Sequence, residues 1–148
     1  SIALHGASNP FAVGAIVHVA HNFLAQEILL IGEGTFYAKA SMGMQKYETL
    51  VALDDDNAFF EKVRGRPVWA FEREASRRSL YAVSEFPDDV VFLFGSERFG
   101  LAPSVLARAN DVLGIPLYGV NQSLPLAVAA GIVMNEWARQ RYAPGRLI

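Results

Sequence analysis

The segment Val90-Val-Phe-Leu-Phe-Gly-Ser-Glu-Arg-Phe-Gly-Leu101 decides the fold class of this 148-residue chain. Its first five residues are apolar, which is typical of a strand buried on both faces of a parallel sheet. Gly95, Glu97 and Gly100 then follow the strand and predict a tight turn toward a helix. A glycine at a strand end lets the backbone approach a ligand closely, and Gly100 permits a positive φ. Considered alone, the segment also fits an ordinary strand-to-helix turn with a capping glutamate.

Short apolar runs of the same kind alternate with helical patterns along the whole chain. This alternation predicts an α/β fold, with a mainly parallel sheet flanked by helices. The predicted strands are residues 2–4, 27–31, 50–52, 68–71, 90–94 and 111–115. The predicted helices are residues 11–23, 57–64, 103–109 and 126–142, and residues 42–47 are predicted as a loop or a short helical turn.

The composition predicts a single domain that spans residues 1–148. Hydrophobic residues make up 52% of the chain and charged residues 19%, which is typical of a globular domain with a sizeable core. The chain has no cysteine and three histidines (His5, His18 and His21), so thiol nucleophiles and Cys-ligated zinc are excluded, and we expect no metal site. Without a visible linker or repeat, the sequence offers no domain boundary.

The charge and hydropathy of the chain restrict its partners. Thirteen Lys and Arg against fifteen Asp and Glu give a net charge of -2, so any nucleic-acid contact requires a local basic patch. Candidate patches are Arg73, Arg77 and Arg78 in one segment, and Arg139, Arg141 and Arg146 near the carboxyl terminus. A solvated loop and a favourably charged helix end remain the alternatives. The longest strongly apolar stretch, residues 124–134, is shorter than the roughly 20 residues of a membrane span, so we expect a cytoplasmic protein.

Two further segments have polar or titratable residues where ligands of α/β sheets bind, at the carboxyl ends of strands. In residues 115–125, Asn121, Gln122 and Ser123 offer amides and a hydroxyl to a small polar molecule, while Ile115 and Leu124 could clasp a flat apolar group. Residues 6–19 contain a helix entry at Ser8-Asn9-Pro10, followed by His18. Histidine suits a general base near neutral pH, although a structural helix histidine is the more frequent case.

Taken together and in this order, these segments resemble the SpoU (TrmH-like) branch of the SPOUT superfamily, whose members are S-adenosylmethionine-dependent RNA ribose 2′-O-methyltransferases. Residues 9–18 resemble the first motif of that family, residues 94–101 the second, and residues 115–140 the third. The resemblance runs from about Ser8 to Arg141. It implies a SPOUT-type fold with a deep carboxyl-terminal trefoil knot, which is a rare exception to the rule against threaded chains. It also implies a homodimer through the carboxyl-terminal helix, and a tRNA or rRNA substrate rather than DNA.

The resemblance assigns expected roles to individual residues. The positions implied to bind the cofactor, S-adenosyl-L-methionine, are Phe71, Glu72, Gly95, Ile115, Leu117 and Leu124. The positions implied to be catalytic are His18, Glu97 and Ser123, of which His18 is the candidate base. The positions implied to contact the RNA substrate are Asn9, Arg98 and Asn121.

Three residues depart from the family pattern. Active relatives usually carry Asn at the position of Ala12 and Arg at that of His18. Their third motif usually reads Ser-Leu-Asn, whereas the corresponding residues here are Ser123-Leu124-Pro125. An arginine-to-histidine change removes the bidentate fork that suits phosphate or ribose. The alternative hypothesis is therefore a non-catalytic knotted homologue that acts as an RNA-binding or dimeric interaction module. An unrelated nucleotide binder is not supported, because the chain has neither a dinucleotide fingerprint nor a phosphate loop.

Overall fold

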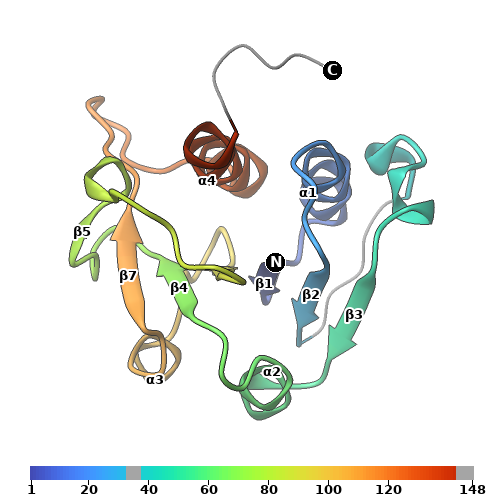
Figure 1. The fold of residues 1–148 in the computed structure, drawn as a ribbon, viewed down its shortest axis with the longest axis horizontal. Coiled ribbons are helices and arrows are strands. Elements are labelled where there is room, and N and C mark those ends of the chain that lie inside the picture. The colour runs from blue at the N-terminus through green and yellow to red at the C-terminus, as the bar shows by residue number, and fades with distance from the viewer. Residues whose placement is uncertain (33–37, 143–148) are drawn as a thin grey trace.

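The computed structural model describes residues 1–32 and 38–142, and these residues form an α/β fold around one seven-stranded sheet (Figure 1). The strands are β1 (Ile2–His5), β2 (Ile28–Ile31), β3 (Leu50–Leu53), β4 (Val68–Phe71), β5 (Arg78–Ser79), β6 (Val91–Phe94) and β7 (Asp111–Gly114). Their order across the sheet is β3-β2-β1-β6-β4-β7-β5, and every neighbouring pair is parallel. The sheet is therefore parallel throughout rather than mainly parallel.

All six predicted strands are confirmed, with bounds that differ by one residue at some ends. The seventh strand, β5, is absent from the prediction. Its two residues, Arg78 and Ser79, contain no apolar run, and β5 forms only through its pairing with β7 at the edge of the sheet.

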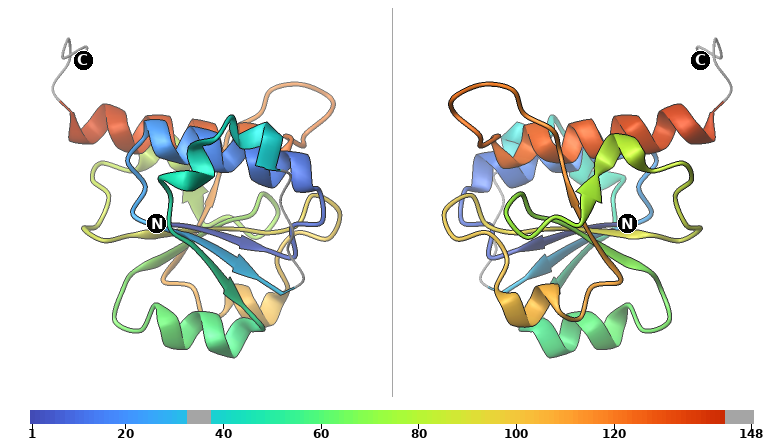
Figure 2. Two further views of the ribbon diagram at one scale, coloured as in Figure 1. Left: turned by 90° about the vertical axis from the view of Figure 1, so that its right-hand side faces the viewer. Right: turned by 90° about the vertical axis from the view of Figure 1, so that its left-hand side faces the viewer.

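Helices cover both faces of the sheet. The helices are α1 (Pro10–Asn22), α2 (Asp56–Lys62), α3 (Pro103–Leu106) and α4 (Leu126–Arg141), with short 3-10 turns at Ala38–Ser41, Met44–Lys46 and Leu80–Ala82. Helices α1 and α4 lie side by side over one face, and α2 and α3 lie over the other (Figures 1 and 2). Two hydrophobic clusters fill the spaces between these layers, which is why strands such as β4 and β6 are apolar at every position.

Local signals set the helix ends. The Asn9 side chain caps α1, because its Oδ1 accepts hydrogen bonds from the amides of Phe11 and Ala12 at 3.0 and 3.3 Å. The prediction of a helix at residues 103–109 is wrong in length, since α3 ends at Leu106. Beyond it the chain turns back to the sheet, where Asn110 exchanges two hydrogen bonds of 2.8 Å with the backbone of Val68. The predicted helical turn within residues 42–47 is confirmed by the 3-10 turn at Met44–Lys46.

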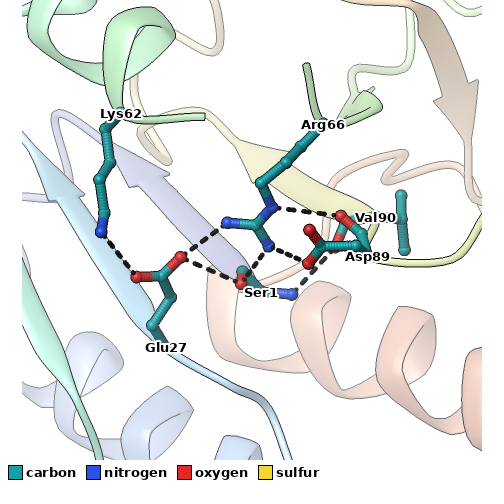
Figure 3. Close-up of polar contacts among 6 residues, drawn as sticks. All are labelled: Ser1, Glu27, Lys62, Arg66, Asp89 and Val90. Carbon is teal, nitrogen blue, oxygen red and sulfur yellow. Dashed lines mark hydrogen bonds and ion pairs between the residues drawn. The ribbon is translucent and has the colours of Figure 1, made fainter. Parts of the chain in front are cut away.

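Charged residues meet at the amino-terminal edge of the sheet, where the parallel strands begin (Figure 3). Glu27 directly precedes β2, and its carboxylate contacts Arg66 Nη1 at 2.7 Å and Lys62 Nζ at 3.4 Å. Arg66 also contacts the Asp89 carboxylate at 2.8 Å. The side chains of Glu27 and Arg66 are only 10% and 15% exposed. We call these four residues the Glu27 cluster, and it ties the starts of β2, β4 and β6 to the end of α2.

The opposite edge of the sheet is built from loops. The segments that follow β6 and β7 project at the carboxyl-terminal end of the strands, and the loop after β7 leads back over the sheet into α4 (Figure 2). None of the helices in the described residues is long and apolar enough to span a membrane.

Candidate functional site

A pocket of about 440 Å³ opens where β4, β6 and β7 end. Its walls come from residues 71–74 at the end of β4, from residues 94–98 and Gly100 at the end of β6, and from residues 113, 115, 117 and 122–124 at and after the end of β7, with two residues of α4 closing one side. The carboxyl edge of an open parallel sheet is the usual ligand site of α/β folds, and this volume suits a cofactor-sized molecule. The pocket therefore lies where the sequence predicts ligand chemistry.

The loop after β6 is folded tightly on itself. The amide of Gly100 donates to the Ser96 carbonyl at 2.9 Å, and Ser96 and Gly100 form an isolated antiparallel bridge. A Cβ atom on Gly95 would overlap the carbonyl group of Gly100, so a side chain at position 95 would force the loop apart. Gly100 has a φ of +63°, a conformation that glycine adopts without strain. The two glycines are thus required for different reasons, close approach at one and a positive φ at the other.

Glu72 joins the ends of β4 and β6. Its Oε2 accepts a hydrogen bond from the Leu101 amide at 3.2 Å, and its Oε1 accepts one from the Arg73 amide at 3.0 Å. This carboxylate also lies against Gly100, because a Cβ there would collide with it. Glu72 therefore fixes the shape of the pocket wall.

Glu97 connects the same loop to α4. Its Oε1 accepts a hydrogen bond from the amide of Leu126, the first residue of α4, at 3.3 Å. Pro125 occupies the N-cap position of α4, and its side chain accepts no hydrogen bond from the helix. The Glu97 carboxylate takes the place of a capping side chain by accepting from a free amide of the first turn. A negative charge at a helix amino terminus is also favoured by the helix dipole.

The loop between β7 and α4 forms the remaining wall. Asn121 Oδ1 accepts hydrogen bonds from the amide and the hydroxyl of Ser123, at 3.2 and 2.9 Å. The guanidinium of Arg73 donates to the Gln122 side chain, which links this loop to the segment after β4 across the pocket. The Ser123 hydroxyl therefore keeps its lone pairs for a partner inside the pocket.

The lining combines apolar surface with a small excess of negative charge. Ile115 and Leu117 are apolar and partly exposed, and Phe71 stacks on the buried Phe94 with ring centroids 5.0 Å apart. The ionic side chains in the lining are Glu72, Glu74, Glu97, Arg73 and Arg98, so that carboxylates outnumber guanidiniums. Such a lining suits a ligand that has a flat apolar part and a net positive charge.

The structure brings most of the predicted site residues together. Lining the pocket are all six positions predicted for the cofactor (Phe71, Glu72, Gly95, Ile115, Leu117 and Leu124) together with Glu97, Ser123 and Arg98. Asn9 and Asn121 are outside the lining. Asn9 caps α1, and Asn121 accepts a hydrogen bond from the Ser123 hydroxyl. His18 is also outside the lining: it is half-buried on α1, and in the described part of the chain its imidazole has no hydrogen-bond partner. Prediction from sequence missed Glu74, whose only signal is its proximity to the end of β4.

Both groups of arginines considered as RNA-binding patches are largely neutralised. The ion pairs join Arg73 to Glu74, Arg78 to Asp111, Arg139 to Glu136 and Arg141 to Asp88, with N–O distances of 2.7 to 2.9 Å. The hydrogen bond from Arg139 holds the pKa of the Glu136 carboxyl below its ordinary value, although burial opposes this effect. Arg146 lies outside the described residues. These four arginines are therefore poorly suited to hold a phosphate backbone without first losing a carboxylate partner, whereas Arg77 is exposed and, among the described residues, contacts the Asn110 carbonyl at 3.5 Å and forms no ion pair.

Comparison with solved structures shows the same architecture in RNA-modifying proteins. A structure described as "Structural insights into the 2-OH methylation of C/U34 on tRNA" is 32% identical, covers 95% of this chain and 94% of its own, and superposes with a TM-score of 0.86. An AdoMet-bound rRNA methyltransferase from Sinorhizobium meliloti is 26% identical, with 96% of this chain and 56% of its own covered and a TM-score of 0.86.

Sequence comparison gives the family. A tRNA (guanosine(18)-2'-O)-methyltransferase from Thermus thermophilus is 34% identical over 111 residues, which are 74% of this chain and 57% of that protein. The chain thus spans little more than half the length of this relative. The profile of the SpoU rRNA Methylase family matches residues 1–135, which include every strand and the pocket described above. The chain belongs to the SpoU rRNA Methylase family.

Proposed function

We propose that this chain binds S-adenosyl-L-methionine in the pocket at the carboxyl edge of the sheet and transfers its methyl group to a ribose 2′-hydroxyl of a tRNA or rRNA. The observation that carries the proposal is the convergence of the six predicted cofactor residues on one pocket. The relative from Thermus thermophilus, a tRNA 2'-O-methyltransferase, supports the reaction, and the AdoMet-bound rRNA methyltransferase from Sinorhizobium meliloti supports the cofactor. With such a substrate the protein would work in the cytoplasm.

The residues of the pocket fit this methyl donor. S-adenosyl-L-methionine carries a sulfonium, an ammonium and a carboxylate, and its net positive charge complements a lining in which carboxylates outnumber guanidiniums. The adenine is flat and apolar on its faces, which suits Ile115 and Leu117. Its polar edge requires hydrogen bonds, and the backbone of the loops after β6 and β7 offers amides and carbonyls at the lining.

The bound donor supplies an electrophilic methyl group, and the side chains of this chain must position the ribose and remove its proton. Glu72 and Glu97 hold the loop after β6 in place through the amides of Leu101 and Leu126. The Ser123 hydroxyl can accept a hydrogen bond from the substrate while it donates to Asn121.

His18 remains the proposed base, but only in an assembly. Because His18 does not line the pocket of its own chain, a second copy would have to bring its α1 to the site. We therefore propose a homodimer through α4, whose packing against α1 places both helices on the same face of the sheet. Val128 is 47% exposed on α4 and offers an apolar contact for the partner. Val128→Glu should convert a dimer into a monomer in analytical ultracentrifugation.

We also propose that residues 1–148 act as one domain and that the chain is knotted near its carboxyl terminus. Support for the knot comes from the path of the chain: β6 lies between β1 and β4, β7 lies on the far side of β4, and the chain then returns to α4 beside α1. Single-molecule stretching tests the knot, because a trefoil would leave the unfolded chain shorter than the roughly 3.3–3.6 Å per residue of full extension.

The experiment that tests the function has two readouts. Titration calorimetry should detect binding of S-adenosyl-L-methionine, and incubation with labelled donor and total tRNA or rRNA should place the label on a nucleotide that resists alkaline cleavage at its 3′ side. Donor binding without transfer to any RNA would favour the non-catalytic alternative that Ala12, His18 and Pro125 raise. The absence of donor binding, with or without RNA, would contradict the proposal.

A further inference from the structure

Two aromatic residues, each directly after a pocket-lining residue in the chain, are largely exposed. Phe99 follows Arg98 in the loop after β6, and 79% of its surface is open to solvent. Tyr118 follows Leu117 in the loop after β7, and 93% of its surface is open. Arg98 and Leu117 both line the pocket, so each aromatic residue directly follows a lining residue in the chain. Large aromatic side chains at a polar, concave site are typical of binding surfaces.

A cation accompanies one of these rings. The guanidinium carbon of Arg98 lies 5.1 Å from the centroid of the Phe99 ring, which is a cation–π contact. Among residues 1–32 and 38–142, Arg98 has no ion pair, whereas Arg73 and Arg78 near the same edge are both paired with carboxylates. Arg98 is exposed and keeps its charge available to an anionic partner. We call Arg98, Phe99 and Tyr118 the aromatic rim.

We propose that the aromatic rim binds unpaired nucleotides of the RNA by stacking, and that it makes the protein select a single-stranded loop over a duplex. This inference rests on the proposed function for its RNA. A nucleobase offers an aromatic face only when it is unstacked, and RNA-binding proteins take up such bases on exposed aromatic rings and guanidinium planes. A target ribose in the pocket would place its neighbouring nucleotides at the rim.

The composition around the rim favours RNA over an apolar protein partner. The loop that carries Tyr118 continues through Gly119 and the fully exposed Val120 to Asn121, Gln122 and Ser123, so that exposed amides and a hydroxyl outnumber the one aliphatic side chain. An unpaired guanidinium at the rim would be desolvated at a cost in an apolar interface, whereas a phosphate would pair with it. The surface therefore combines stacking rings, a cation and polar groups, as single-stranded nucleic acid requires.

The test compares a short RNA hairpin with a blunt duplex of the same stem, by fluorescence anisotropy, for the wild type and for Phe99→Ala and Tyr118→Ala. Each variant should bind the hairpin about 5- to 150-fold more weakly, the range expected for one lost base–aromatic stack. Binding to the duplex should change less than about twofold, since a duplex hides its base faces. Phe99→Trp should keep the preference for the hairpin, because indole also stacks.

Tyr81→Ala is the matched control, because Tyr81 is 57% exposed and neither of its neighbours in the chain, Leu80 and Ala82, lines the pocket. It should bind both RNAs as the wild type does. Unchanged hairpin binding in Phe99→Ala and Tyr118→Ala, equal losses on both RNAs, or a wild type that does not bind the hairpin would overturn the inference. A change of oligomeric state in these variants on ultracentrifugation would also overturn it, since the rim would then be an interface between copies.

Donor titration separates this inference from the proposed function. The rim variants should bind S-adenosyl-L-methionine with the affinity of the wild type, because neither ring lines the pocket. If the wild type selects the hairpin through the rim but binds no donor, the inference stands and the proposed function fails. If the donor binds and methyl transfer occurs while the rim variants bind the hairpin normally, the proposed function stands and the inference fails.

Discussion

At the amino-terminal edge of the sheet Glu27 contacts two cations and is nearly buried, whereas at the carboxyl-terminal edge Arg98 is exposed and has no carboxylate partner in the described chain. Both residues lie next to strands of the same sheet, and both edges have a pocket of about 440 Å³. The amino edge satisfies its charges internally. The carboxyl edge leaves hydrogen-bonding groups and charge for a ligand, so the two edges differ in function although strands of the same kind build them.

The difference shows where polarity stabilises the fold and where it serves binding. In the Glu27 cluster, each charged side chain pairs with an opposite charge from another segment of the chain, which holds the starts of β2, β4 and β6 together. At the pocket, Glu72 and Glu97 accept hydrogen bonds from backbone amides, which shape the loops, while Arg98 and Ser123 keep bonding capacity.

Removal of Glu27 should have the largest effect on stability. Glu27→Ala removes the carboxylate that pairs with the largely buried Arg66 guanidinium, and breaking such a buried pair costs about 3 kcal/mol. Urea denaturation should show this loss in the free energy of unfolding. Donor affinity of the folded variant should remain that of the wild type, because the Glu27 cluster is at the opposite edge from the pocket.

An exposed pair provides the control for this variant. Glu61 forms an ion pair with Arg64 on the surface of α2, and both side chains are largely exposed. Glu61→Gln should change the free energy of unfolding by less than about 0.5 kcal/mol. A comparable loss in both variants would contradict the special role of the Glu27 cluster.

Gly95→Ala should have the largest effect at the carboxyl edge. The new Cβ would overlap the Gly100 carbonyl group, and such overpacking costs about 1–3 kcal/mol. We expect donor affinity to fall about 5- to 150-fold in titration calorimetry, since the loop after β6 forms one wall of the pocket. Gly119→Ala is the matched control, because its Cβ would meet only the Asn121 carbonyl oxygen, at 3.8 Å. Equal effects of the two substitutions would refute the role of the tight loop.

Acid should weaken the amino edge. Burial alone would raise the pKa of Glu27, but the hydrogen bond from Arg66 and the charges of Lys62 and Arg66 together hold that pKa below its ordinary value of 4.5. A carboxyl group whose pKa is lower in the folded state contributes stability above its unfolded pKa and loses it as the pH falls through its folded pKa. The wild type should therefore lose stability below about pH 4.5, and Glu27→Gln should lose less over the same range in urea titrations. Parallel curves for the two proteins would show that Glu27 does not carry this dependence.

Glu97→Gln should have a small effect on stability. The substitution keeps an acceptor for the Leu126 amide but removes the negative charge at the start of α4, which is worth about 0.3–1 kcal/mol. Thermal unfolding should detect a slight loss, and raised salt should reduce it by screening the charge in the wild type. A gain in stability would mean that charge repulsion between Glu97 and the other pocket carboxylates outweighs its attraction to the amino terminus of α4.

Much of the fold could be predicted because the strands are apolar throughout. Runs such as residues 68–71 and 90–94 must be buried on both faces, which requires a parallel sheet between helices. The edge strand β5 was missed because Arg78 and Ser79 contain no such run. The sequence predicts a longer α3 than the structure has, because the hydrogen bonds between Asn110 and Val68 that return the chain to the sheet join residues far apart in sequence.

The candidate site was predictable as a group of loops, but its contacts were not. Parallel strands bring their carboxyl ends to one edge, so glycine and polar residues after β4, β6 and β7 meet there. The pairing of the arginines could not be foreseen, since Arg78 and Asp111 are 33 residues apart and Arg141 and Asp88 are 53 apart. Such partners depend on how the connecting segments pack, which local patterns do not encode.

The most direct test of the central claim is a crystal structure of the protein with S-adenosylhomocysteine at saturating concentration. We predict density for the ligand between the loops after β6 and β7, within reach of Gly95, Ile115 and Leu124. Ligand in the pocket of equal volume at the amino edge, beside Met134 and Trp137, would contradict it. So would a structure in which the carboxyl-edge pocket stays empty under these conditions.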